Sequence, residues 1–429
     1  MLYSLNPTLR IERVGEEYFL SFLVNGNLKK IKANPWDLLA VKIVDEAHNL
    51  LELSRAYGTQ IKFLQKILAY GKDRGYLCRN ISKIVRSEPP YQTAYFPNEN
   101  FKISEVFTLQ WHITNRCDMK CQHCYDRGSI TELPLPQNLK ILEDFYQFCE
   151  EMGAFGHISF SGGNPFLYPD FLKLYQKASE MGFGLSILGN PVTEEAIAQI
   201  CEIEVPAYYQ VSLEGLEEVN DKIRGKGHFK RTLSFLKLLE KYDVPRGVMM
   251  TLHEINLEDL IPLALYIEEF TDTFTFNRLS LVGEAKGLTP TSKEKFFNVL
   301  ERFLEISEEK GYLELKDNFF NYLLIKQGKP LSGGCTGFGC GAAFNFLVLL
   351  PNGEVHACRK FPSPLGNILS ASLKEIYYSE EAQRYRLGSI KCQGCKLYGL
   401  CRGCLAVTHS YNLDPFKELD PYCPGPIIY

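Results

Sequence analysis

Three cysteines in one short segment have the spacing to do chemistry together. Cys117, Cys121 and Cys124 follow one another at intervals of four and three residues, so a single loop can direct three sulfurs toward one point. Iron–sulfur clusters are held by cysteine thiolates and normally take four of them. A cluster held by three would leave one iron open to a small molecule. A zinc knuckle is the competing interpretation, although zinc loops usually space their cysteines differently.

Eight further cysteines gather toward the C-terminus: Cys335, Cys340, Cys358, Cys392, Cys395, Cys401, Cys404 and Cys423. Their number suits two four-cysteine sites, which could hold zinc or iron–sulfur clusters. The three cysteines that remain, Cys78, Cys149 and Cys201, lie in helical or apolar contexts where buried free thiols are common.

Alternating apolar strands and amphipathic helices must position the first cysteine loop. We expect strands at 106–114, 157–161, 184–188, 208–213, 247–252 and 273–281, with helices at 136–152, 169–181, 193–202, 229–242, 257–270 and 292–311. Six β-then-α units predict an α/β fold with a parallel sheet. The loop would follow the first strand, at the face where βα barrels carry their chemistry. Spacing alone does not separate a partial barrel from a doubly wound sheet.

The cysteine loop, with His123 before its last cysteine, closely resembles the signature of radical S-adenosylmethionine (SAM) enzymes. Later segments are similar to further motifs of that family: Gly162-Gly163-Asn164-Pro165 resembles its Gly-Gly-Glu-Pro, and Ser212-Leu213-Glu214-Gly215 its Ser-Leu-Asp-Gly. The resemblance implies a partial (β/α)6 TIM-like barrel, open along one side. It also implies that Cys117, Cys121 and Cys124 hold a [4Fe-4S] cluster whose open iron binds SAM.

The same resemblance implies SAM contacts from His123, Gly162, Gly163, Asn164, Ser212, Glu214 and Arg224. Glycines allow close backbone approach to the methionine amino group, and Arg224 would pair with the SAM carboxylate. Asn164 replaces the usual glutamate, which keeps an acceptor oxygen but loses the charge. His112 is expected to be a packed histidine rather than a ligand.

The C-terminal cysteines closely resemble the SPASM extension, which binds two auxiliary [4Fe-4S] clusters in enzymes that modify peptides and proteins. By this resemblance Cys335, Cys340, Cys358 and Cys404 hold one auxiliary cluster. Cys392, Cys395, Cys401 and Cys423 hold the other, which brings the total to three. The family pattern has three residues before its last cysteine, whereas only two separate Cys401 from Cys404. The geometry of Cys404 is therefore in question.

Residues 1–85 predict a winged-helix-like domain, because a hairpin with an Asn25-Gly26 turn precedes about three short helices. This order is similar to PqqD-like peptide-recognition domains, which capture a leader peptide as an added strand. A packing or dimerisation module is one alternative. DNA binding is another, but no dense Arg/Lys/Asn/Gln face indicates base readout, so nucleic acid is not expected. Residues 86–105 predict a linker, 106–315 the barrel and 316–429 the auxiliary-cluster domain.

Charge is unevenly distributed along the 429 residues. The net charge is −4, yet residues 1–95 hold 14 Lys or Arg against 9 Asp or Glu and so suit an acidic partner. No run of about 18 apolar residues and no signal-peptide pattern is found. We therefore expect a cytoplasmic protein without a membrane partner.

The resemblance implies a radical SAM oxidoreductase that matures a ribosomally made precursor peptide, with the leader bound by residues 1–85. A reductant such as flavodoxin or ferredoxin would supply an electron to cleave SAM. The auxiliary clusters would accept an electron as a thioether or other crosslink forms. Sulfatase-maturase-like protein oxidation is disfavoured, because Arg359 stands where that group has an aspartate. The other alternative, an iron–sulfur or zinc DNA-binding regulator, would bind duplex DNA with strong salt dependence.

Overall fold

The N-terminal unit combines a small sheet with three helices. The computed structural model describes residues 2–86 and 101–428. Strands β2 (Arg10–Val14), β3 (Glu17–Val24) and β4 (Asn27–Lys32) form an antiparallel sheet, and helices α1 (Pro35–Asp45), α2 (Leu50–Tyr57) and α3 (Ile61–Arg74) follow. Strand β1 (Tyr3–Leu5) pairs with β5 (Leu77–Arg79). The predicted turn is present, with φ of 51° at Asn25 and 80° at Gly26.

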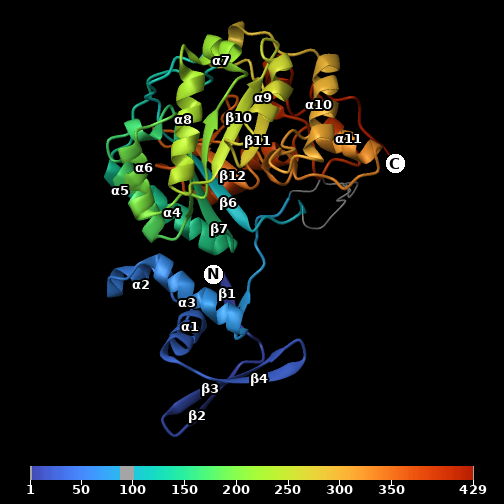
Figure 1. Ribbon diagram of the computed structural model, residues 1–429. Helices are drawn as coiled ribbons and strands as arrows, with labels where there is room; N and C mark the ends of the chain where they lie inside the picture. Colours follow the sequence, from blue (N-terminus) through green and yellow to red (C-terminus); the bar gives the residue numbers. More distant parts are fainter. Residues whose placement is uncertain (1, 87–100, 429) are drawn as a thin grey trace.

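The central sheet runs in sequence order. Strands β6 (Val106–Thr114), β7 (Phe155–Gly162), β8 (Gly184–Leu188), β9 (Tyr209–Ser212), β10 (Arg246–Leu252) and β11 (Thr273–Arg278) are all parallel and each pairs with the next. A doubly wound sheet reverses its strand order at a switch point. No reversal occurs along this series, so the partial barrel is the correct alternative (Figure 1).

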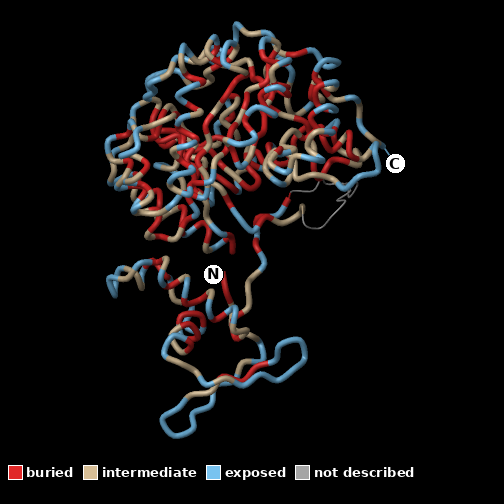
Figure 2. Tube along the Cα trace, in the orientation of Figure 1, coloured by how far each residue is buried: buried red, intermediate tan, exposed pale blue. Residues whose placement is uncertain are grey.

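Helices on the outer side of the sheet close its crossovers. They are α4 (Leu135–Met152), α5 (Phe171–Glu180), α6 (Glu194–Ile203), α7 (Glu217–Arg224), α8 (His228–Lys241), α9 (Leu260–Tyr266) and α10 (Lys293–Ser307), followed by α11 (Phe320–Lys326). Short 3-10 helices occur at η2 (Pro165–Leu167), η3 (Leu257–Asp259), η4 (Gly283–Gly287), η5 (Gly334–Thr336) and η6 (Ile390–Cys392). Figure 2 shows that buried residues concentrate in this barrel, whereas the hairpins of the N-terminal unit are largely exposed.

The C-terminal region extends the barrel sheet rather than forming a separate one. Strand β12 (Phe346–Leu349) pairs in parallel with β6, and β13 (Glu354–His356) and β14 (Pro364–Asn367) continue antiparallel from it. A hairpin with Asn352-Gly353 at its turn thus joins β12 to β13. Helices α12 (Leu373–Tyr378), α13 (Glu380–Leu387) and α14 (Leu405–Ser410) complete the chain.

The N-terminal unit contacts the outer surface of the barrel. The Arg79 guanidinium donates to the Gly153 carbonyl at 3.0 Å and stacks 4.3 Å from the centroid of Phe155. Lys62 pairs with Glu204 at 2.7 Å. Among the described residues, no helix is both long enough and apolar enough to cross a membrane.

Candidate functional site

The first cysteine loop leaves β6 at the carboxyl end of the sheet, as predicted. Cys117 is exposed, whereas Cys121 and Cys124 are half-buried. The loop is held by main-chain bonds, because the amide of Gln122 donates to the Ile223 carbonyl at 3.1 Å and the amide of Glu284 to the Cys124 carbonyl at 2.9 Å. Burial raises the pKa of the Cys121 thiol, and the adjacent Arg224 opposes that rise. A cation bound at the loop would favour the ionised form of this sulfur.

The glycine pair after β7 is a support for this loop. A Cβ at Gly162 would lie 2.1 Å from the Thr114 carbonyl oxygen, and one at Gly163 would lie 2.1 Å from that of Arg116. The amide of Gly163 donates to the Thr114 carbonyl at 2.9 Å and that of Asn164 to the Arg116 carbonyl at 2.8 Å. Only glycines permit so close an approach. The cysteine loop and the SAM-motif candidate are thus one packed unit.

Two amide side chains meet beside Cys117. Asn164 and Asn190 donate to the same Asp118 carboxylate oxygen at 3.2 and 2.8 Å, and the Asn190 amide nitrogen lies 3.5 Å from the Cys117 sulfur. Neither Asp118 nor Asn190 is among the site residues predicted from the sequence. Their positions in the sequence could have indicated a place in the site, because Asp118 follows the first cysteine and Asn190 follows β8 at the same edge of the sheet.

Glu214 is the centre of a buried polar group. Its carboxylate accepts from the Arg224 guanidinium at 2.6 and 2.9 Å, lies 3.3 Å from His123 Nε2, and accepts from the Thr251 amide at 2.7 Å. Burial alone would raise the pKa of this carboxyl, but His123 and Arg224 together hold it well below its usual range. Ser212 lies two residues upstream, where β9 ends. The structure thus pairs Arg224 with Glu214, while its contact with a SAM carboxylate stays a prediction.

Arg224 also connects this group to the cysteine loop. Its other guanidinium nitrogen lies 3.7 Å from the Cys121 sulfur. Glu214 after β9, Arg224 on α7, and His123 and Cys121 in the cysteine loop are therefore one connected cluster. His112, by contrast, is fully buried with Nδ1 3.2 Å from the Asp126 carboxylate, which agrees with the packed role expected for it. Asp126 also pairs with Arg359 from the C-terminal region.

Four cysteines gather at the start of the C-terminal region, and we call them the first set: Cys335, Cys340, Cys358 and Cys404. Burial raises the pKa of the thiols of Cys335, Cys340 and Cys358, and the nearby Cys404 adds to each rise. The four lie on η5, on the turn after it, after β13 and at the start of α14. Sequence-distant segments thus bring together the four cysteines that were expected to act together.

The other four cysteines, Cys392, Cys395, Cys401 and Cys423, form the second set and line one largely apolar cavity. Burial raises the pKa of Cys392 to about 12, and Cys423 and Cys395 add to the rise. Phe319, Leu397 and Ile427 lie among the other lining residues. An apolar cavity lined by four sulfurs fits a cysteine-ligated iron–sulfur cluster.

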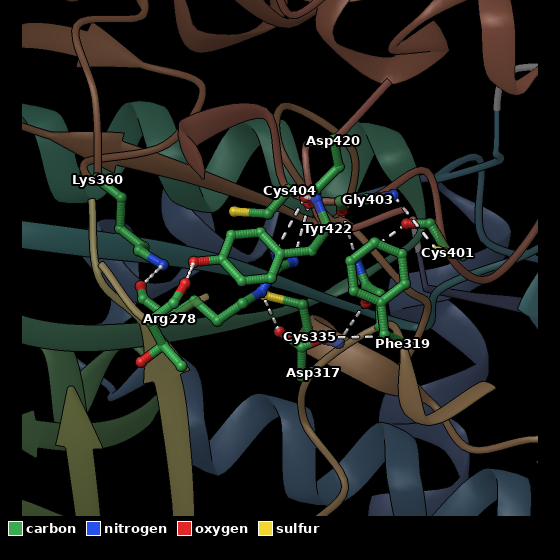
Figure 3. Close-up of polar contacts among 12 residues, drawn as sticks. Arg278, Asp317, Phe319, Cys335, Lys360, Cys401, Gly403, Cys404, Asp420 and Tyr422 are labelled. Carbon is green, nitrogen blue, oxygen red and sulfur yellow. Dashed lines mark hydrogen bonds and ion pairs between the residues drawn. The ribbon is translucent and has the colours of Figure 1, made fainter. Parts of the chain in front are cut away.

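The short spacing between Cys401 and Cys404 is accommodated by the backbone. The two intervening residues are both left-handed, with φ of 58° at Arg402 and 62° at Gly403. This turn directs Cys401 to the second set and Cys404 to the first. The Asp420 carboxylate accepts from the Cys404 amide at 2.7 Å and holds the end of the turn in place (Figure 3).

Neither set resembles a compact single-ion site. Within residues 2–86 and 101–428, no group of three or more His, Cys, Asp or Glu side chains is close enough to share one metal ion. Ligands of a four-iron cluster stand farther apart, because each sulfur binds a different iron. Cys78, Cys149 and Cys201 belong to the N-terminal unit, α4 and α6.

Comparisons with known proteins agree with this arrangement. The radical SAM superfamily model matches residues 111–267, and a model described as SPASM, an iron–sulfur cluster-binding domain, matches residues 340–405. Fe-coproporphyrin III synthase of Methanosarcina barkeri is 31% identical over 354 residues, covering 73% of this chain and 86% of that protein. The mycofactocin maturase MftC of Mycolicibacterium smegmatis is 28% identical, covering 73% and 82%.

One similar solved structure spans nearly the whole chain. Streptococcus suis SuiB, bound to its precursor peptide SuiA, superposes with a TM-score of 0.60 at 16% identity and covers 99% of this chain and 100% of that one. The likeness in fold therefore includes the N-terminal unit as well as the barrel and the cysteine-rich region.

Proposed function

Because this chain belongs to the radical SAM superfamily and carries a SPASM iron–sulfur cluster-binding domain, we propose that it modifies a ribosomally made precursor peptide. The observation that carries the proposal is the full-length likeness to SuiB, which adds an N-terminal unit to the barrel and cysteine-rich region. A barrel and SPASM region alone would not point to a peptide, because the 31% identical relative is a porphyrin enzyme by name.

Cys117, Cys121 and Cys124 would hold one [4Fe-4S] cluster, and the first and second sets one each. When bound, the first cluster and SAM supply a 5′-deoxyadenosyl radical that abstracts a substrate hydrogen. The chain's own residues hold that site in place: Gly162 and Gly163 support the loop, and Glu214 fixes Arg224 beside Cys121. The auxiliary clusters would take up the electron released as a thioether or other crosslink forms. A flavodoxin or ferredoxin would supply the electron for SAM cleavage.

The N-terminal unit would bind the leader along β4. This strand is at one edge of its sheet and carries Lys29, Lys30 and Lys32, which suit an acidic peptide. The exposed aromatic side chains of Trp36, Phe63 and Tyr70 lie on α1 and α3, and Arg74 at the end of α3 donates to the Lys32 carbonyl. An added strand would gain main-chain hydrogen bonds from the edge and apolar contacts from these rings.

The test is anaerobic reconstitution with iron and sulfide, followed by an assay with SAM and a reductant. The peptide to test is the product of any short cysteine-containing open reading frame found next to the gene. We expect 5′-deoxyadenosine from SAM and a change in peptide mass. Cys124→Ala should abolish both. The control incubates the same reconstituted protein with iron-porphyrin precursors, and formation of iron-coproporphyrin III with the peptide unchanged would overturn the proposal.

A further inference from the structure

A buried arginine from the start of the predicted linker lies inside the cysteine-rich region. Arg86 is 2% exposed, and its guanidinium donates to the carbonyl of Cys340, 254 positions later in the chain, at 2.7 Å. Its backbone amide donates a hydrogen bond to the Lys102 carbonyl at 2.8 Å, and the neighbouring residue Val85 forms a β-bridge with Ile103. The side chain is therefore held in place against the first set.

The charge of Arg86 is only partly matched by its surroundings. The guanidinium carbon lies 4.3 Å from the centroid of the Phe344 ring. Nε and the second terminal nitrogen have no hydrogen-bond partner, and no carboxylate of the described residues is among the main charge neighbours of Arg86. Buried charges in proteins are paired or lie against metal centres. Within residues 2–86 and 101–428, no anion thus lies against this guanidinium.

A second buried guanidinium lies near that of Arg86. Arg402 lies between the two sets, with Cys340, Cys392 and Cys401 among its charge neighbours, and its Nε donates to the Tyr398 carbonyl at 3.0 Å. Burial lowers the pKa of Arg86, and the nearby charge of Arg402 lowers it further. Two cations are therefore held beside cysteines that would carry negative charge when ligated.

Other buried arginines of this region are satisfied in ordinary ways. Arg278 pairs with Asp317 and Asp420, and Arg386 donates to the carbonyls of Ala343 and Tyr377 at 2.9 and 2.7 Å. Neither places an unbonded guanidinium nitrogen beside a cysteine set. Arg386 is therefore a matched control for removing a buried cation from the same region.

We propose that Arg86 is a positioning residue for the auxiliary iron–sulfur cluster of Cys335, Cys340, Cys358 and Cys404, and that its charge raises the reduction potential of that cluster. The inference rests on the proposed occupancy of this set but not on the identity of the substrate. Adding an electron makes a cluster more negative, and a fixed neighbouring cation favours that state. Net charge and hydrogen bonds to sulfur are known to set such potentials. The two unbonded nitrogens of Arg86 are donors available for such bonds.

The experiment is a potentiometric titration monitored by electron paramagnetic resonance. It uses the reconstituted full chain in which Cys117, Cys121 and Cys124 are all changed to Ala, so that only the auxiliary clusters contribute. Arg86→Gln removes the charge, Arg86→Lys keeps it, and Arg386→Gln is the control. We expect Arg86→Gln to lower the equilibrium constant for reduction of one cluster at least tenfold, which is about 59 mV for one electron. Arg86→Lys should stay near the parent value, and Arg386→Gln should not change it.

An Arg86→Gln chain with full iron and potentials within twofold of the parent constant would overturn the proposal. If Arg86→Gln binds less iron than the parent, the iron content of Arg86→Lys tests whether the loss of charge is the cause. Full iron in the lysine variant supports the charge role, whereas equal loss in both variants overturns it. Failure of the peptide assay would leave these titrations intact. Reconstitution with no iron at residues 335–423 would instead refute the occupancy.

Discussion

Arg278 at the end of β11 and Asp420 near the C-terminus form a buried two-point ion pair. The two terminal guanidinium nitrogens lie 3.0 and 2.9 Å from the two carboxylate oxygens, and Asp317 accepts from Nε at 2.7 Å. Figure 3 shows the pair beside Cys404 and Tyr422. Because Asp420 also accepts from the Cys404 amide, the barrel strand and the first set share one anchor.

Replacing Arg278 by Met should strongly destabilise the protein. Removing one partner leaves two buried carboxylates unpaired, which costs about 3–5 kcal/mol in comparable cases. Chemical denaturation followed by circular dichroism would show a lower midpoint, and iron content should fall as Cys404 loses its support. Lys374→Ala breaks an exposed ion pair with Glu151 and should change stability by under about 1 kcal/mol. Equal effects from the two variants would contradict the anchor role.

Gly163→Ala should empty the first loop of iron while sparing the auxiliary sets. The added methyl would meet the Arg116 carbonyl oxygen, a backbone atom that cannot move without shifting the cysteine loop. Iron content after reconstitution should drop from about 12 to about 8 per chain, and SAM cleavage should be lost. Gly128→Ala is the matched control in the segment after the loop, where nothing lies within 4 Å of the new atom. Retention of all the iron in Gly163→Ala would show that the loop tolerates the shift.

Glu214→Gln should reduce stability in a pH-dependent way. The folded pKa of Glu214 lies well below its usual range, so the ionised carboxylate contributes stability above the unfolded value of about 4.3. That contribution is lost as the pH falls toward the folded pKa. The stability difference between parent and variant should be constant from about pH 8 to 5 and should shrink below about pH 4. A difference that persists undiminished in acid would mean that packing, not charge, is responsible.

Lys30→Pro should weaken leader binding more than Lys30→Ala. The amide of Ala33 donates to the Tyr18 carbonyl of β3, and alternation along the strand then turns the amides of Leu28, Lys30 and Lys32 to the open edge. Both variants lose the Lys30 charge and its contacts with Glu12 and Phe19, but only proline also removes an outward amide donor, and it spares the bonds to β3. Fluorescence anisotropy with a labelled leader peptide would measure both. Equal affinities would exclude strand addition on β4.

Sequence patterns predicted the parallel series well because the strands are short segments rich in apolar residues that alternate with amphipathic helices. The predicted ranges 106–114 and 184–188 match β6 and β8 at both ends. Helix α7 was not predicted, because it has only eight residues and most of them are charged, so no apolar periodicity marks it. The pairing of β12 with β6 was also missed, since four apolar residues contain no information on a partner more than 200 positions away.

The candidate site was predictable as a set of residues but not as a set of contacts. Motif order selected Glu214 and Arg224, yet nothing in the sequence indicates that they bind each other. Composition likewise marked residues 86–105 as a linker, whereas its first residue, Arg86, is buried; residues 87–100 lie outside the described structure. Such contacts arise from tertiary packing, and the local spacing of residues in the sequence does not predict them.

The parallel pairing of β12 with β6 fixes the geometry between the candidate redox centres. The register places Leu349 beside Trp111, so the strand that leads to Cys117 and the hairpin that leads to Cys358 are joined by main-chain hydrogen bonds. Domains that merely pack against each other are free to shift on their interface. Here the barrel and the cysteine-rich region share one continuous sheet. The gap that an electron would have to cross is therefore set by strand pairing and would stay constant while a substrate enters and leaves.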